Sequence, residues 1–425
     1  MKGTRGVELT LLIVGAVVTV AAYGLLNLGV RADVGGLVGG FGLILLGLLL
    51  GAHIVVRFAA PYADPLLLPL AALLNGVGYV MIARLNSGLA DSQLAWTFIG
   101  VGAFCVTLIL VPDLGWVANY RYTLALAGVV ALMLPLIPGL GVNINGAQIW
   151  LRVGPFSIQP GEFAKILFAA FLAGYLADKG DLLSISNRKI GLVHIPDLRH
   201  FGPLLSAVAV ALMVMVFQRD LGSSLLLFTL FMVMIYVATQ RLAFVAAGLV
   251  LFMGGAVVAW RMFSHVQRRV DIWLNPFADP KDAGFQIVEA AFALADGRIG
   301  GTGLGSGTPN KIPYADTDMI FAAIGEELGL LGATAILAAF MFFVSAGFRV
   351  AATTTDTFQK LLAAGLTSLL GFQAFIIIGG VLRVLPLTGV TLPFVSYGGS
   401  SLISNYIILA LLMRISDSSI RERRA

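Results

Sequence analysis

The chain has 425 residues, of which 59% are hydrophobic and only 12% are charged, against roughly 25% charged in an average soluble domain. A soluble protein of this size could not cover so much apolar surface with its polar residues. The composition excludes a cytosolic enzyme, a secreted disulfide domain and a disordered chain, and indicates an all-α integral membrane protein. Lys and Arg exceed Asp and Glu by 27 − 22 = +5. In such a protein this excess is read loop by loop, and we expect no nucleic-acid partner.

Apolar segments divide the chain into spans, because a helix needs ~20 apolar residues to cross a hydrocarbon core of ~30 Å. We find about twelve segments of suitable length. In chain order they are 9–29, 36–57, 66–84, 93–112, 122–138, 161–178, 203–219, 220–239, 241–262, 318–348, 360–383 and 395–414. They predict a polytopic helical bundle. The seventh and eighth are joined by a tight turn at 218–222.

The basic residues predict which side of the membrane each loop faces. An even number of spans puts both termini on one side. Outside the long segment 263–317, most Lys and Arg then lie on the side of the N-terminus, which the positive-inside rule assigns to the cytoplasm. The tail 416–425 is short and basic. Three polar segments, 149–162, 263–317 and 392–401, fall on the outer face, so we expect a functional site at the outer membrane interface.

The large outer loop, 263–317, holds the first candidate for chemistry. Asp279 is a carboxylate that could act as a general base. It also precedes Pro280, a pattern typical of a helix N-cap, and the two interpretations stay open at this point. The apolar stretch after it, up to Ala295, is too short to span and predicts an interfacial or re-entrant helix. Asp282, Gln286 and Glu289 would share one face of that helix.

Two cations lie close to the 149–162 segment. Arg152 precedes Gly154-Pro155, and Lys165 lies about one turn inside the sixth span. A lysine there either snorkels or pairs with Glu162 three residues earlier, or it binds an anionic ligand such as a diphosphate. The residues alone do not decide between these alternatives.

Other polar groups lie at span ends. Asp318, Glu326 and Glu327 open the tenth span, where they could coordinate a cation, relay protons or pair with a buried Arg, or simply occupy helix-end positions. The glycine run 300–307 follows no strand and has no Gly-Lys-Ser/Thr ending, so it is not a nucleotide-binding loop. The run 396–401 supplies hydroxyls at a helix start, which suits either anion binding or a turn with an N-cap. None of the four histidines has a zinc-ligand spacing.

Several of these segments, taken in order, resemble the shape, elongation, division and sporulation (SEDS) family. The matching blocks are Trp150-Leu151-Arg152 with Gly154-Pro155-Phe156, Gln159-Pro160 with Glu162 and Lys165, Gln218 with Asp220-Leu221-Gly222, the loop 275–286, Thr317-Asp318 with 326–329, and 392–401. The resemblance covers about residues 93–415. It implies one membrane domain with a ten-helix core. The first three spans, 1–92, contain an additional pair.

The resemblance also implies a function. Members are peptidoglycan glycosyltransferases that polymerise lipid II outside the bacterial cytoplasmic membrane, with an essential acidic residue that matches Asp279. By the same resemblance, substrate and diphosphate binding falls to Arg152, Glu162, Lys165, Gln286, Ser396, Ser400 and Ser401, and a supporting role to Thr317, Asp318, Glu326 and Glu327. We expect a divalent cation, Mg²⁺ or Mn²⁺, with unassigned ligands, and no organic cofactor. The implied partner is a class B penicillin-binding protein, besides lipid II and membrane lipid.

Some residues depart from the family pattern. Gly161 stands where the family usually has Ser, and Arg219 where it usually has Pro. The additional early spans and the short tail favour the elongation branch of the family (RodA) over the division branch (FtsW), although Thr391 favours the latter. A lipid II flippase is the rival class, and it would need a polar path to both faces. A non-catalytic scaffold for wall synthesis would tolerate loss of Asp279.

Overall fold

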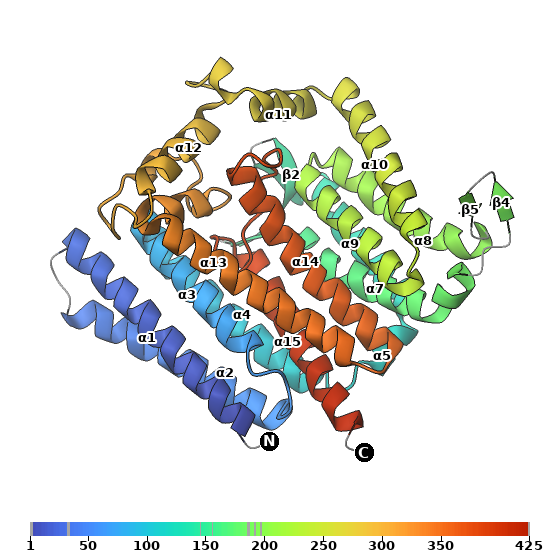
Figure 1. The fold of residues 1–425 in the computed structure, drawn as a ribbon, viewed down its shortest axis with the longest axis horizontal. Helices are drawn as coiled ribbons and strands as arrows, with labels where there is room; N and C mark the ends of the chain where they lie inside the picture. Colours follow the sequence, from blue (N-terminus) through green and yellow to red (C-terminus); the bar gives the residue numbers. More distant parts are fainter. Residues whose placement is uncertain are drawn as a thin grey trace. The chain divides into compact units, whose positions relative to one another are not determined.

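The computed structural model describes residues 3–31, 35–144, 146–154, 156–184, 188–190, 193–195 and 198–423 (Figure 1). Pro155 and the last two residues of the predicted tail lie outside the described residues. The long helices are α1 (Gly3–Arg31), α2 (Gly35–Ala59), α3 (Leu67–Leu85), α4 (Ser87–Leu110), α7 (Pro160–Ser184), α8 (Leu198–Phe217), α9 (Leu221–Thr239), α10 (Leu242–Met262), α13 (Ile320–Thr353), α14 (Thr357–Val381) and α15 (Gly399–Glu422). The shorter helices are α5 (Gly115–Asn119), α6 (Arg121–Met133), η1 (Leu134–Leu136), α11 (Ser264–Leu274), η2 (Pro276–Ala278), α12 (Phe285–Gly297) and η3 (Pro309–Lys311).

The chain is a multi-pass helical membrane protein, as predicted. Within the described residues, ten helices are long and apolar enough to cross a membrane, so the predicted count of about twelve is not confirmed. The predicted spans 122–138 and 203–219 coincide with the shorter apolar helices Arg121–Leu136 and Gly202–Phe217. At 1.5 Å per residue each of these apolar stretches covers ~24 Å, less than the ~30 Å of the hydrocarbon core, and α8 itself begins four residues before its apolar stretch, at Leu198.

The chain folds into two compact units, each made of several segments. Unit 1 comprises Met1–Leu110, Ala259–Ala346 and Gln373–Met413, and unit 2 comprises Val111–Val258, Gly347–Phe372 and Arg414–Ala425. In unit 1, α1 packs against α2 and α3, and α4 packs against α2 and α3 (Figure 1). In unit 2, α7 packs against α5, α6, α8 and α9. The aromatic side chains of Phe168 and Phe171 on α7 are fully buried in that core.

A buried charged cluster joins the first two helices. Glu8 in α1 accepts a hydrogen bond from Arg5, one turn earlier, and its Oε1 lies 2.7 Å from Nδ1 of His53 in α2. Arg5 also donates to the main-chain oxygen of Ala63. Charged groups in an apolar core are costly unless they are paired. The cluster therefore fixes the packing of α1 on α2 and on the 60–66 turn.

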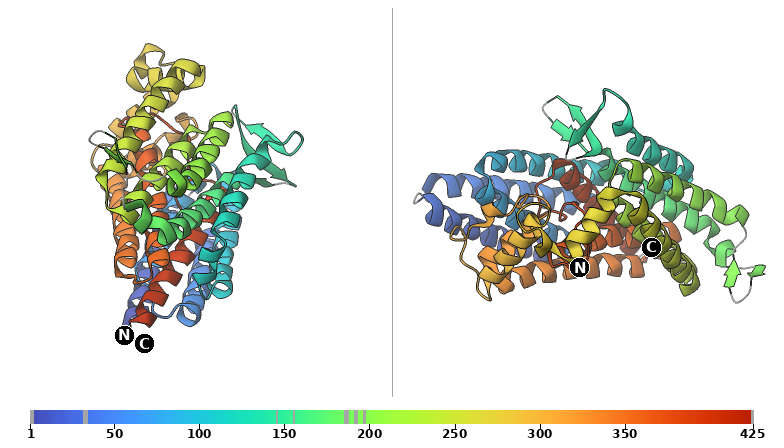
Figure 2. Two further views of the ribbon diagram at one scale, coloured as in Figure 1. Left: turned by 90° about the vertical axis from the view of Figure 1, so that its right-hand side faces the viewer. Right: turned by 90° about the horizontal axis from the view of Figure 1, so that it is seen from above.

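Short strands add to the all-α prediction. In unit 2, β1 (Gly141–Ile144), β2 (Ala147–Val153) and β3 (Phe156–Ile158) form an antiparallel sheet in the order β1-β2-β3, with Arg152 opposite Ser157. Figure 2 shows this sheet projecting from the helices of its unit. β4 (Arg188–Ile190) and β5 (Val193–Ile195) form a separate antiparallel pair. None of these strands was predicted from the sequence.

The large loop also differs in part from its prediction. The expected helix is α12, but it begins at Phe285 after an N-cap at Gly284, not after Asp279. Asp282 therefore lies before the helix and does not share its face with Gln286. A second helix in the loop, α11, was not predicted. Its sequence, SHVQRRVDIWL, is amphipathic rather than apolar, so a search for apolar segments does not detect it.

Candidate active site

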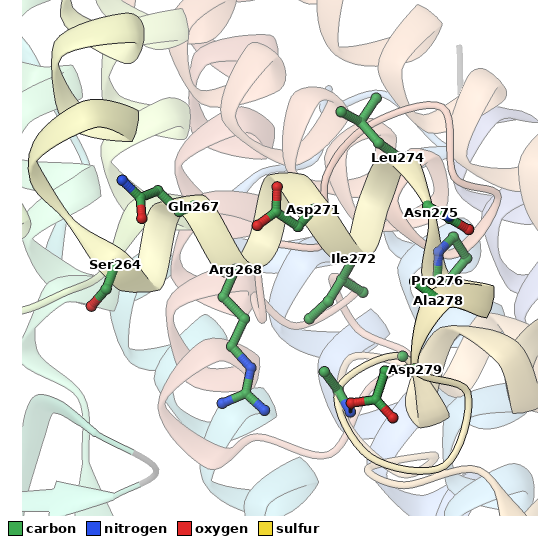
Figure 3. A pocket seen from close by; sticks show the side chains of 12 residues that line it. Ser264, Gln267, Arg268, Asp271, Ile272, Leu274, Asn275, Pro276, Ala278 and Asp279 are labelled. Carbon is green, nitrogen blue, oxygen red and sulfur yellow. Dashed lines mark hydrogen bonds between the residues drawn. The ribbon is translucent and has the colours of Figure 1, made fainter.

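A groove with a volume of about 510 Å³ lies in unit 1 between α11 and the turn after it. It is lined by Ser264, Gln267, Arg268, Asp271, Ile272, Leu274, Asn275, Pro276, Ala278, Asp279, Ala283 and Gly284. Figure 3 shows the side chains of Arg268, Ile272 and Asp279 on the same side of α11, with Asp271 and Leu274 on the other. The groove thus brings a carboxylate from the large loop close to a cation from α11.

Asp279 is exposed and directly follows η2. Its Oδ2 accepts a hydrogen bond from the main-chain N of Ala283 at 3.3 Å, and its main-chain oxygen accepts one from N of Gly284 at 2.8 Å. These bonds close a turn ahead of α12. The helix N-cap interpretation of Asp279 is therefore wrong, because the carboxylate caps this turn and not a helix. The turn holds an acidic side chain at the groove, which a general base requires.

Two links hold α11 in place. The Nη1 of Arg269 donates to the main-chain oxygens of Leu387 and Thr388, at 3.3 and 3.1 Å. One turn later, the indole N of Trp273 donates to the oxygen of Arg383 at 3.0 Å, and Arg383 donates back to the oxygen of Trp273 at 3.3 Å. Residues four apart share a helix face, so this face of α11 is fastened to the 383–388 segment.

A polar cluster lies behind the start of α12. The side-chain amide of Gln286 donates to Oδ1 of Asp318 and to the oxygen of Pro313, both at 3.4 Å, and Thr317 donates to the same Oδ1 at 3.3 Å. Burial raises the pKa of Asp318 to about 6, although these hydrogen bonds and the charge of Arg269 oppose the rise. The predicted residues Gln286, Thr317 and Asp318 are therefore brought together.

The predicted serines lie inside the chain's own hydrogen-bond network. Ser396 donates to the oxygen of Thr317 at 2.5 Å and accepts from N of Leu392 at 2.9 Å. Ser401 accepts from the hydroxyl of Thr391 at 2.8 Å. Ser396, Ser400 and Ser401 are buried. These contacts fasten the 391–401 segment to the start of α13. A substrate-binding role for the serines stays a prediction.

Glu326 and Glu327 in α13 accept hydrogen bonds from the glycine run 300–307 and the residue after it. The Nε of Arg84 in α3 donates to Oε1 of Glu327 at 2.7 Å, while N of Gly305 donates to the other oxygen at 3.1 Å. Glu326 accepts from N of Thr308 at 2.6 Å. The sequence left open whether these carboxylates coordinate a cation, relay protons, pair with an arginine or occupy helix-end positions. Glu327 pairs with an arginine, Arg84. Arg84 was not among the predicted residues, although a charge at the end of an apolar span was a signal.

A kink in α13 lies at the same place. Gly329 has φ +65° inside the helix, and the main-chain N of the next residue, Leu330, bonds instead to the oxygen of Arg298 at 3.0 Å. Thr302 N donates to the oxygen of Glu326 at 2.9 Å. A Cβ on Gly329 would lie 2.2 Å from N of Gly301. The glycines therefore allow the loop main chain to replace helical hydrogen bonds at the kink.

The remaining candidates belong to unit 2. Arg152 is exposed on β2. Lys165 and Glu162 are buried in α7 and form an ion pair with Nζ and Oε1 3.0 Å apart. The pairing alternative for Lys165 is confirmed. Its role towards a substrate remains a prediction.

The described residues contain no group of three or more His, Cys, Asp or Glu side chains that could hold a metal ion. Asp271 and Asp279 both line the groove, but Figure 3 shows their carboxylates on different sides of α11. The described residues at the groove therefore do not fit a resident metal site made of protein ligands.

Comparison with known proteins decides the family. A family model described as a cell cycle protein, covering FtsW, RodA and SpoVE, matches residues 66–421. The chain belongs to the SEDS family. The match starts earlier than the resemblance found from the motifs, and it takes in α3, which carries Arg84.

Relatives of named function show which branch of the SEDS family is nearer. The chain is 47% identical to the peptidoglycan glycosyltransferase RodA of Mycobacterium tuberculosis, over 99% of this chain and 92% of that protein. It is 32% identical to the probable peptidoglycan glycosyltransferase FtsW of Geobacter metallireducens, over 83% of this chain and 94% of that protein. The chain is closer to RodA than to FtsW. The match to RodA includes the additional helices α1 and α2.

A solved structure has the same fold. One chain of a peptidoglycan synthase complex that coordinates polymerization and crosslinking superposes with a TM-score of 0.70 and 26% identity. The match covers 84% of this chain and 98% of that one. The SEDS fold is therefore shown by sequence and by structure.

Proposed function

We propose that this SEDS protein is a RodA-type peptidoglycan glycosyltransferase that polymerises lipid II into β-1,4-linked glycan strands during cell elongation and cell-shape maintenance. The observation that carries the proposal is the exposed carboxylate of Asp279 at a groove formed by the family's large loop. The 47% identity to a protein named as a peptidoglycan glycosyltransferase supports it.

In the proposed reaction, Asp279 takes the proton from the 4-hydroxyl of the acceptor N-acetylglucosamine. That oxygen forms a bond to the anomeric carbon of the donor N-acetylmuramic acid, and the bond from this carbon to the diphosphate breaks. Undecaprenyl diphosphate leaves with the electron pair, and an α-linked diphosphate becomes a β-1,4 glycosidic bond. One carboxylate suffices for such an inverting displacement, because no covalent sugar–enzyme intermediate forms.

The neighbouring contacts support the placement of the base. The Asp279 turn leads directly into α12, where Gln286 bonds to Asp318. The α11 helix on the other side of the groove is fastened by Arg269 and Trp273. Side chains that act in catalysis work best on supports that hold them in position. A divalent cation, Mg²⁺ or Mn²⁺, would be held through the substrate's diphosphate with few protein ligands.

The proposal extends to partner and location. A class B penicillin-binding protein, a single-span transpeptidase, would cross-link the new strand, in keeping with the synthase complex that shares the fold. The chain would lie in the cytoplasmic membrane of a bacterium, with both termini in the cytoplasm and the Asp279 groove outside. A lipid-tailed substrate would reach that groove from the outer leaflet.

The rival function is transport of lipid II across the membrane, and one pair of assays separates it from polymerisation. The purified chain, with and without its transpeptidase, is given labelled lipid II and Mn²⁺ or Mg²⁺, and products are resolved as glycan ladders. In parallel, proteoliposomes report movement of labelled lipid II between leaflets. We expect ladders. Transport without ladders, with partner and metal present, would make the flippase the better description.

A further inference from the structure

The α11 helix has one face that is fastened and one that faces the groove. Arg269 and Trp273 bond to main-chain oxygens of the 383–388 segment. The neighbouring Arg268 makes neither of these bonds and instead lines the groove. Its side chain is 64% exposed. Two adjacent arginines thus have different surroundings, because a step of one residue turns a side chain by about 100° around a helix.

The side chains that line the groove carry more negative than positive charge. Of the twelve described residues that line it, Arg268 is the only one with a positive charge, against the carboxylates of Asp271 and Asp279. Figure 3 shows the guanidinium of Arg268 and the carboxylate of Asp279 on the same side of α11. A dianionic group placed beside Asp279 would be repelled by it without a cation nearby.

The present partner of Arg268 holds it loosely. Its Nη2 lies 4.0 Å from Oδ2 of Asp282, whose side chain is 84% exposed. Exposed pairs of this kind contribute little free energy, so a ligand with two phosphates can replace Asp282 at small cost. Lys165 differs in this respect, because it is buried and 3.0 Å from Glu162.

We propose that Arg268 is a substrate-binding residue that holds the diphosphate of the lipid-linked donor at the Asp279 groove. The inference rests on the proposed function and identifies a cation for it. A guanidinium bonds two phosphate oxygens at once through its planar fork, which a lysine ammonium cannot do. When the bond from sugar to diphosphate breaks, negative charge grows on the leaving group. The contact therefore strengthens in the transition state.

Binding is tested separately from turnover. The full chain in detergent is titrated with fluorescent undecaprenyl diphosphate and with undecaprenol, which lacks phosphate. Arg268→Ala, Arg268→Lys and wild type are compared with Arg261→Ala, which removes an exposed arginine outside the groove. We expect Arg268→Ala to weaken binding of the diphosphate by roughly 10- to 100-fold, Arg268→Lys to weaken it less, and undecaprenol to bind all variants alike. Equal diphosphate affinity in Arg268→Ala and Arg261→Ala would overturn the inference.

Turnover gives a second readout. With lipid II, Arg268→Ala is expected to lower kcat and raise KM, because the contact serves both the bound donor and the transition state. A change in neither constant would overturn the inference while leaving the proposed function intact. Arg268-dependent binding of the diphosphate in a wild-type chain that forms no glycan would keep the binding residue and reject the polymerase. Melting temperatures within a few degrees of wild type show that the variants fold.

Discussion

Arg84 at the end of α3 and Glu327 in α13, 243 positions apart in the chain, form an ion pair with 2.7 Å between Nε and Oε1. Glu327 is fully buried, and Arg84 also bonds to the main-chain oxygen of Gly307 at 2.8 Å. The pair connects a helix of the bundle, the glycine run and the kinked start of α13. It stabilises the glycine run of the large loop, which follows α12.

Removing one partner of this pair is therefore expected to be costly. Arg84→Met leaves a buried carboxylate without its cation. We expect this to lower the free energy of unfolding by about 3–5 kcal/mol. The double variant Arg84→Met, Glu327→Leu should recover much of this loss, because no charge remains unpaired. Thermal unfolding in detergent measures the cycle. Lys179→Ala, which removes a half-exposed partner of the exposed Asp178, is the control and should change the free energy by less than about 1 kcal/mol. Purely additive effects of the two substitutions would contradict this account.

The pKa of Asp318 predicts a pH dependence of stability. Because burial raises this pKa from 3.8 to about 6 in the folded state, the folded protein binds the proton more tightly than the unfolded chain. The contribution of Asp318 is thus present in full below pH 4 and is lost as pH rises through 6, a difference of at most about 3 kcal/mol. Asp318→Asn should remove this part of the slope. Identical pH profiles of unfolding for the two proteins between pH 4 and 7 would reject the prediction.

The kink at Gly329 should tolerate no side chain. Gly329→Ala puts a Cβ on a residue with φ +65° and 2.2 Å from N of Gly301, so it should cost at least about 1–3 kcal/mol and displace the 298–308 segment. Gly51→Ala, in a helix with nothing within 4 Å of the added atom, is the matched control and should be neutral or stabilising. Protease sensitivity of the loop and thermal unfolding report both effects. Equal stability of the two variants would show that a side chain at position 329 causes no strain, which would contradict this account.

The sequence predicted the helical membrane class, and it singled out Asp279, which the structure places at a groove. Other residues show what could not be predicted from the sequence. Asp279 was found because a polar block in a long loop is visible along the chain. Arg268 and Arg84 were missed because their roles depend on what they approach in space: one on a groove, the other on a carboxylate in α13. Two predicted spans ran too far at their C-terminal ends: the stretch 122–138 ends at Leu136, in the 3-10 turn that contains Pro135, and the stretch 203–219 ends at Phe217. Arg269 and Trp273 are four residues apart, as expected for two side chains on one face of a helix. A search for apolar residues at helical spacing does not detect this pair, because Arg269 is charged.

The N-cap interpretation of Asp279 failed for a local reason. Proline after an acidic residue favours a helix start, but here the residues from Pro280 to Gly284 form a turn closed by the carboxylate and the main-chain oxygen of Asp279. Local propensity favours a capping role for the carboxylate, and the element that it caps is a turn rather than a helix. The same side chain thereby remains exposed at the groove.

The most direct measurement compares glycan ladders made from labelled lipid II by wild type, Asp279→Asn and Asp296→Asn. Asp296 is an exposed carboxylate on α12 that does not line the groove, so its variant controls for charge. If Asp279 is the general base, Asp279→Asn should slow polymerisation by about 10²- to 10⁴-fold while melting like wild type. It should bind undecaprenyl diphosphate at least as tightly as wild type, because a repelling charge is removed, and Asp296→Asn should retain wild-type ladders. Ladders of wild-type length and rate from Asp279→Asn would contradict the account.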